Sequence, residues 1–92
     1  MSTLESKIQA SCLKYAKSKG WYVLKIIKCN VNGFPDSVIF KDGKTIFVEF
    51  KSLIGKQSEL QKYQQKQLEA QGFKYYLINN LKNFQEMLQI NN

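Results

Sequence analysis

Apolar residues recur at helical spacing through the N-terminal part of the chain. They are Leu4, Ile8, Cys12, Tyr15 and Ala16. This spacing predicts an amphipathic helix. Ser2 and Glu5 stand at the spacing of a capping box, and Gly20 supplies a stop. We therefore expect the first helix to lie between Ser2 and Gly20.

The pattern then changes to runs of aromatic and β-branched residues separated by turn residues. The runs are Trp21 to Cys29, Ser37 to Phe40 and Thr45 to Phe50, and the turn signals are Asn32-Gly33 and Asp42-Gly43. Such runs are typical of strands, and Asp-Gly between two of them is typical of a two-residue hairpin loop. We expect three strands, of which the last two form a hairpin.

Helical spacing returns in the second half of the chain. Ser58 and Gln61 again fit a capping box, and Leu60, Tyr63 and Leu68 mark one face of a Gln-rich helix that ends at Gly72. Lys74 to Ile78 reads as a fourth strand. A terminal helix carrying Leu81, Phe84, Met87 and Leu88 should open at Asn79 or Asn80.

The expected order is thus α-β-β-β-α-β-α. A mixed four-stranded sheet flanked by helices is the natural packing of that order, which places the chain in the α/β class. At 92 residues we expect one domain, spanning residues 1–92. The sequence has no apolar run of signal-peptide or membrane-spanning length, so we expect a soluble, cytoplasmic protein without a membrane partner.

Charge and missing residue types narrow the chemistry. Fourteen Lys/Arg against seven Asp/Glu give a net charge of +7, which favours an anionic partner, nucleic acid before membrane. The absence of histidine excludes Ser-His, Cys-His and HExxH chemistry. Cys12 and Cys29 lack metal-ligand spacing, so we expect both to be reduced and packed in the core rather than in a disulfide or zinc site.

The hairpin brings charged residues together. A two-residue loop at Asp42-Gly43 pairs Lys41 with Lys44 and, counted outward, places Asp36 opposite Glu49. Opposed residues share a face of the sheet with Cβ atoms about 4.5–5.5 Å apart, and Lys51 lies on that face too. Opposed carboxylates need a compensating cation, either Lys51 or a metal, and oxygen ligands favour Mg²⁺ or Mn²⁺.

An alternative interpretation needs no active site. Asp36 would cap the turn at residues 33–35, while Glu49 and Lys51 would form an ordinary solvated ion pair. The apolar surroundings of these strands favour a site, because a central strand rarely carries charge without a function.

Two sequence motifs resemble those of a known family. Gly33-Phe34-Pro35-Asp36, followed after twelve residues by Glu49-Phe50-Lys51, resembles the PD-(D/E)xK nuclease signature. The segment Gly55-Lys56-Gln57-Ser58-Glu59-Leu60-Gln61, closed later by Gly72, is similar to the VRR-NUC family within that superfamily. The resemblance covers nearly all of the chain. It implies a restriction-endonuclease-like αβββαβ core, here with an extra C-terminal helix.

The resemblance also implies roles for individual residues. Asp36 and Glu49 would bind Mg²⁺, or Mn²⁺, together with the backbone carbonyl of Phe50, and Lys51 would orient or activate the attacking water. Glu5 would bind metal directly or through water. Its alternative role is the capping box of the first helix.

Gln61 would lie beside this site, and its alternative role is the capping box of the second helix. Phosphate contacts are expected from a set of lysines on the two helices and the loop between them: Lys7, Lys14, Lys17, Lys56, Lys62 and Lys66.

These expectations describe a metal-dependent DNA endonuclease that is selective for branched DNA such as four-way junctions. By resemblance, it would act as a homodimer inside a bacterial cell hosting a phage or prophage, without a small-molecule cofactor. Trp21, Tyr22, Tyr75 and Tyr76 would supply either the dimer interface or part of the core. The alternatives are a catalytically silent DNA-binding module and a nuclease with another DNA or RNA substrate.

Overall fold

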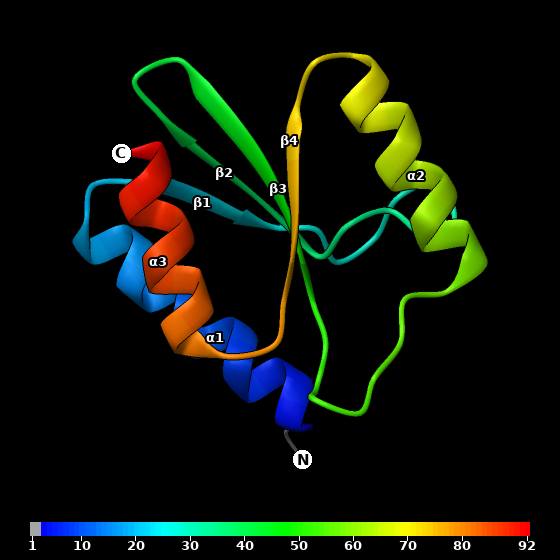
Figure 1. Cartoon of the computed structure of the whole chain (residues 1–92), viewed down its shortest axis with the longest axis horizontal. Coiled ribbons are helices and arrows are strands. Elements are labelled where there is room, and N and C mark those ends of the chain that lie inside the picture. The colour runs from blue at the N-terminus through cyan, green and yellow to red at the C-terminus, as the bar shows by residue number, and fades with distance from the viewer. Residues whose placement is uncertain (1–2) are drawn as a thin grey trace.

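The order of elements in the computed structural model, which describes residues 3–92, is the predicted one (Figure 1). The helices are α1 (Leu4–Ser18), α2 (Glu59–Ala70) and α3 (Leu81–Asn91), and the strands are β1 (Tyr22–Lys25), β2 (Ser37–Lys41), β3 (Lys44–Phe50) and β4 (Lys74–Ile78). The strands form one mixed sheet in the order β1-β2-β3-β4. β1, β2 and β3 pair antiparallel, while β4 pairs parallel to β3. The α/β class and the mixed sheet are therefore confirmed.

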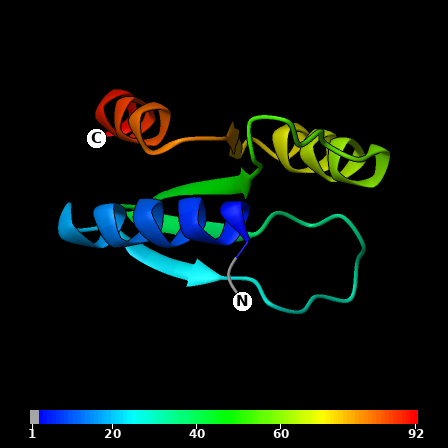
Figure 2. The same ribbon diagram turned by 90° about the horizontal axis from the view of Figure 1, so that it is seen from below.

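The hydrophobic core lies between one face of the sheet and the helices α1 and α3, which lie side by side (Figures 1 and 2). α2 lies on the other side of the sheet, against β4. The core contains residues of α1, β2, β3, β4 and α3, together with Trp21, the residue before β1. Its buried members are Cys12, Leu13, Ala16, Trp21, Ile39, Ile46, Val48, Phe50, Ile78, Phe84, Met87 and Leu88. One face of the sheet is thus closed by two helices, and the other is only partly covered.

The β2–β3 hairpin has the predicted register. Lys41 pairs with Lys44, and Asp42 and Gly43 both have positive φ, 51° and 80°, as a type I′ turn requires. The pairing continues to Ser37 and Val48. The next positions outward on the two strands are Asp36 and Glu49.

β1 is shorter than the predicted strand. It ends at Lys25, and residues 26–36 form a loop rather than the rest of a strand ending at Cys29. The ladder closes with the bond from Ile26 N to Asp36 O, 2.7 Å, because β2 begins only after the turn that contains Gly33 and the buried Pro35. After Ile26 the chain therefore leaves the sheet as a loop.

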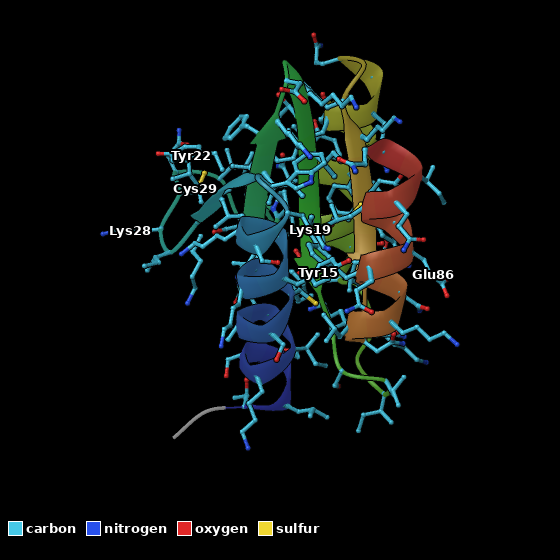
Figure 3. All side chains as sticks on the ribbon, turned by 90° about the vertical axis from the view of Figure 1, so that its left-hand side faces the viewer. Tyr15, Lys19, Tyr22, Lys28, Cys29 and Glu86 are labelled. Atoms are coloured by element: carbon cyan, nitrogen blue, oxygen red, sulfur yellow. The ribbon has the colours of Figure 1, made fainter. Side chains whose placement is uncertain are left out.

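The same loop changes the predicted position of one cysteine. Cys12 is fully buried in the core, as expected, but Cys29 is exposed, so its predicted core packing is wrong. Figure 3 shows Cys29 and Lys28 on this loop, on the side away from α3. Both thiols are free, and burial raises the pKa of Cys12 to about 12, which makes its thiol unreactive.

The helix starts follow side-chain caps. Thr3 Oγ1 accepts from Ser6 N at 3.0 Å and caps α1, whereas the predicted cap Ser2 lies outside the described residues. Asn80 caps α3, one of the two predicted positions. None of the helices in residues 3–92 combines the length and hydropathy needed to span a bilayer.

α2 begins with the predicted capping box, but its predicted apolar face is not buried. Leu60 and Tyr63 are 54% and 56% exposed, and none of the twelve described residues of α2 is buried. The helical spacing predicted the helix correctly. It did not predict that the contacts of α2 with β4 and with the loop before β2 would leave Leu60 and Tyr63 exposed.

Candidate active site

The C-terminal end of β3 meets the first turns of α1 and α2 in a hollow of about 230 Å³. It is lined by residues of all three elements and of the loop before β2: Thr3, Glu5, Ser6, Gln9, Asp36, Glu49, Phe50, Lys51 and Gln61. The five residues predicted to be catalytic, Glu5, Asp36, Glu49, Lys51 and Gln61, are therefore brought together.

Glu49 is the most deeply buried of them, with 1% of its surface exposed. β3 is an inner strand, so Glu49 is flanked by β2 and β4. Its Oε2 accepts from Gln61 Nε2 at 2.8 Å and lies 3.7 Å from Lys51 Nζ. Its Oε1 is buried and has no hydrogen-bond partner among the described residues. A carboxylate in this position lacks part of the stabilisation that water would give it.

The pKa of Glu49 reflects this environment. Burial raises it from 4.5 to about 8, and the charge of Asp36 adds to the rise, as does the hydrogen bond that a shared proton makes between the two acids. Lys51 opposes the rise, and the charge of Glu5 makes the smallest contribution to it. No such bond forms while both acids are ionised, because two carboxylates are both acceptors, which leaves Glu49 Oε1 without a donor.

Asp36 is fixed by the hairpin it precedes. Its Oδ2 accepts from Phe50 N at 2.8 Å, across the end of the β2–β3 ladder. This contact differs from the alternative interpretation, in which Asp36 caps the turn at residues 33–35. The side chain of Phe50 is 2% exposed and packs beside Phe84 in the core, so Phe50 lines the hollow with its backbone.

Gln61 fills both of its alternative roles at once. Its Oε1 accepts from Ser58 N at 2.8 Å, Ser58 Oγ accepts from Gln61 N at 3.1 Å, and its Nε2 donates to Glu49. Because the backbone donor at Ser58 can only face the amide oxygen, the capping box turns the amide NH₂ toward Glu49. The capping box thus also orients the side chain in the site.

Glu5 lies on the first turn of α1 but does not cap it. Its Oε1 accepts from Ser52 N at 3.4 Å, a long bond that joins α1 to the loop after β3. The cap is Thr3, whereas the alternative capping box pairs Glu5 with Ser2, which lies outside the described residues. Gln9, one turn later, was not predicted as a site residue. It donates from Nε2 to Ser37 Oγ at 2.8 Å, and its spacing of four from Glu5 is the signal that would have found it.

The donor atoms in the hollow suit a hard divalent cation. Two adjacent carboxylates, one with a buried and unpartnered oxygen, and a backbone segment at Phe50 offer only oxygen ligands. No cluster of three or more Asp, Glu, Cys or His side chains with metal-site geometry occurs within residues 3–92. Direct protein ligands would therefore come from Asp36, Glu49 and the Phe50 carbonyl, with Glu5 acting through water.

The six lysines predicted to contact phosphate are all exposed, and none of them lines the hollow. Lys62 forms an ion pair with Glu59 at 3.2 Å. A larger hollow, of about 420 Å³, lies at the other end of β3 beside Gly43 and Lys44. Its lysines are already engaged: Lys44 donates to Asn91 O at 2.7 Å and Lys74 to Asn91 Oδ1 at 2.6 Å.

Comparisons with known proteins address the fold. No family model matches the sequence, and no curated protein matches it. A solved structure described as a VRR_NUC domain superposes with a TM-score of 0.85 at 20% identity, covering 96% of this chain and 97% of the other. The chain therefore has the restriction-endonuclease-like α/β fold of that VRR_NUC domain, as the motif resemblance predicts.

Proposed function

We propose that this protein is a metal-dependent DNA endonuclease that hydrolyses phosphodiester bonds in the hollow at the end of β3. The observation that supports this most directly is Glu49, buried beside a second carboxylate with one oxygen unpartnered. Such an arrangement destabilises a fold unless a cation or a proton joins it, and perturbed carboxylates of this kind cluster at functional sites. The fold shared with a VRR_NUC domain is consistent with the proposal.

Each residue then has a distinct task. Asp36, Glu49 and the Phe50 carbonyl would hold Mg²⁺ or Mn²⁺, which supplies positive charge to the phosphate and lowers the pKa of the attacking water. Gln61 holds Glu49 in one orientation through its 2.8 Å bond. The ammonium of Lys51, 3.7 Å from Glu49, orients the water and stabilises charge that develops on the phosphate. Glu5 contributes through water.

The proposed partner is DNA, with branched DNA as the preferred substrate. The support is the net charge of +7 and the exposure of Lys7, Lys14, Lys17, Lys56, Lys62 and Lys66. We include a homodimer in the proposal. Tyr22, 64% exposed on the edge strand β1, is available to an interface, whereas Trp21 and Tyr75 are buried and belong to the monomer. Tyr76 is half-buried against the core.

Cleavage of linear, flap, nicked and four-way DNA and of RNA, in Mg²⁺ and in EDTA, tests the proposal. We expect metal-dependent cleavage of DNA, abolished in Glu49→Gln and Lys51→Ala while DNA binding is retained. Glu59→Gln is the matched control, because the side chain of Glu59 is 91% exposed. Binding without cleavage of any substrate would instead identify a silent DNA-binding module, and cleavage of RNA alone would replace the substrate.

A further inference from the structure

Two large aliphatic side chains project into solvent immediately after the proposed catalytic strand. Leu53 is 74% exposed and Ile54 is 92% exposed. They occupy the two corners of a turn that is closed by the bond from Gly55 N to Ser52 O, 3.0 Å. Turn corners are usually occupied by Gly, Pro, Asn, Asp or Ser. Leucine and isoleucine at both corners expose apolar surface that the turn itself does not need.

The turn is held in place on both sides. On one side Ser52 N donates to Glu5 Oε1 on α1, and on the other Gln57 Nε2 donates to Gln65 Oε1 at 2.9 Å and to Tyr75 Oη at 3.1 Å. A Cβ on Gly55 would lie 3.2 Å from Ser52 Oγ and 3.3 Å from Glu5 Oε1, so the turn packs closely against the first turn of α1. Figure 1 shows this segment leaving β3 and passing the N-terminal end of α1 before it returns to α2.

The surroundings of the turn favour a nucleic acid as the occupant. Lys51 precedes the two aliphatic residues, Lys56 follows them, and the proposed catalytic hollow lies at the start of the same loop. Two side chains are too few for a stable protein interface, which buries roughly 800 Å² on each partner. Two lysines that flank a small apolar tip match a polyanion whose bases have apolar faces. Apolar side chains that enter a base step unstack it and kink the duplex.

We propose that Leu53 and Ile54 form a wedge that inserts into the base stack of bound DNA beside the scissile phosphate. The wedge selects DNA in which stacking is already weakened: a mismatch, a nick, a junction or a frayed end. The inference rests on the proposed function, since it specifies the substrate of the same site. It assigns the selectivity to this turn rather than to the lysines, which contact any duplex alike.

Fluorescence of 2-aminopurine, which brightens when it leaves the base stack, tests the wedge directly. The probe is placed next to a mismatch in a short duplex, and binding is measured in EDTA so that no cleavage is required. The native protein should raise the fluorescence and bind the mismatched duplex about tenfold more tightly than the paired one, because a wedge avoids most of the unstacking cost there. Leu53→Ser/Ile54→Ser should bind both duplexes equally and leave the probe dark.

Ile90→Ser is the matched control, because Ile90 is 78% exposed and lies beside the larger hollow at the other end of β3. Circular dichroism of the double variant and of the single variants Leu53→Ser and Ile54→Ser tests whether unfolding causes the loss of mismatch preference. If the native protein binds DNA without raising the fluorescence, the wedge is overturned. The same holds if the double variant keeps the preference for the mismatched duplex. Both results leave the nuclease proposal standing. A change of oligomeric state in the double variant assigns the turn to a protein interface and also overturns the wedge. If the native protein binds no DNA, both proposals fail.

Discussion

Glu49 is the residue whose charge the surroundings in the hollow both stabilise and oppose. Its position on an inner strand removes it from water, Gln61 and Lys51 stabilise its charge, and Asp36 opposes that charge. Because burial and Asp36 prevail, the protonated form is favoured up to a pH of about 8 when no metal is bound. The protein without metal is therefore a fold whose stability depends on pH through this site.

The sign of that dependence is a first prediction. The pKa of Glu49 rises from 4.5 in the unfolded chain to about 8 in the folded one, so the folded state binds the proton more tightly. In EDTA the contribution of Glu49 to the free energy of unfolding should be highest below about pH 4.5, fall between pH 4.5 and 8, and level off above pH 8. The loss should be a few kcal/mol.

Urea unfolding in EDTA from pH 5 to 9 measures this loss. Glu49→Gln should flatten the curve, because an amide does not titrate. Glu59→Gln should keep the slope of the native protein, since Glu59 is exposed at the start of α2. The same slope in Glu49→Gln as in the native protein would assign the pH dependence to other groups.

Asp36→Asn separates metal binding from fold stability. An asparagine keeps the acceptor for Phe50 N, which Asp36 Oδ2 now bonds at 2.8 Å, but it removes the charge that opposes Glu49. We expect a higher melting temperature without metal. In the native protein Mg²⁺ at ten times its dissociation constant should add about 1.4 kcal/mol, or about 5–10 °C, and the variant should lose most of this rise along with cleavage. Equal Mg²⁺ shifts in the two proteins would show that Asp36 does not hold the metal.

At the scale of elements, the site depends on a close contact between a loop and a helix. Gly33 has φ of 80°, and a Cβ there would lie 2.6 Å from Leu60 C and 2.8 Å from Gln61 N. These are backbone atoms, so they cannot move aside without shifting the first turn of α2. The loop before β2 therefore packs directly against the residue that orients Glu49.

Gly33→Ala and Gly43→Ala form a matched pair. Both glycines have φ of 80°, but a Cβ at Gly43 meets nothing within 4 Å. Each alanine should cost about 1 kcal/mol or more for the left-handed backbone, and Gly33→Ala should cost more because of the contact. We expect only Gly33→Ala to lower cleavage, since it displaces Gln61. Chemical unfolding and cleavage rates measure both effects, and equal losses in the two variants would exclude a role for the contact.

The sequence predicted the elements whose causes are local. The turn at Asp42-Gly43 determines the hairpin register by its own backbone geometry, and with it the approach of Asp36 to Glu49. The Ser58–Gln61 capping box is equally local. Both could be inferred without knowing the rest of the fold.

The misjudged features depend on distant partners. The length of β1 is limited by where β2 begins, and the exposure of Cys29 follows from that limit. The exposure of Leu60 shows that β4 and the loop before β2 cover only part of α2. The contact of Glu5 with Ser52, which lies 47 residues away in the chain, likewise depends on the folded structure. Helical spacing and turn signals carry no information about such contacts.

Across the whole molecule, the two ends of β3 differ in what surrounds their lysines. At the start of the strand Lys44 donates to Asn91 O, a bond that holds the end of α3. At the other end Lys56 is exposed on the loop that leaves the hollow, and no hydrogen bond or ion pair within residues 3–92 engages its ammonium. We therefore expect the charge that binds DNA to act from the end that carries Glu49.

The salt dependence of DNA binding tests this polarity. Affinity should vary little with base sequence in fully paired DNA, and its logarithm should fall linearly with the logarithm of salt concentration, because lysines release counterions from phosphates. Lys56→Gln should lower the magnitude of that slope by about 0.9, the value for one lost phosphate contact. Lys44→Gln removes the same charge from the opposite end of β3 and should leave the slope unchanged, although it weakens the bond to Asn91. If both variants reduce the slope equally, DNA contacts both ends of the molecule, and a site confined to the Glu49 end is ruled out. A flat plot for the native protein would remove the electrostatic basis for DNA as the partner.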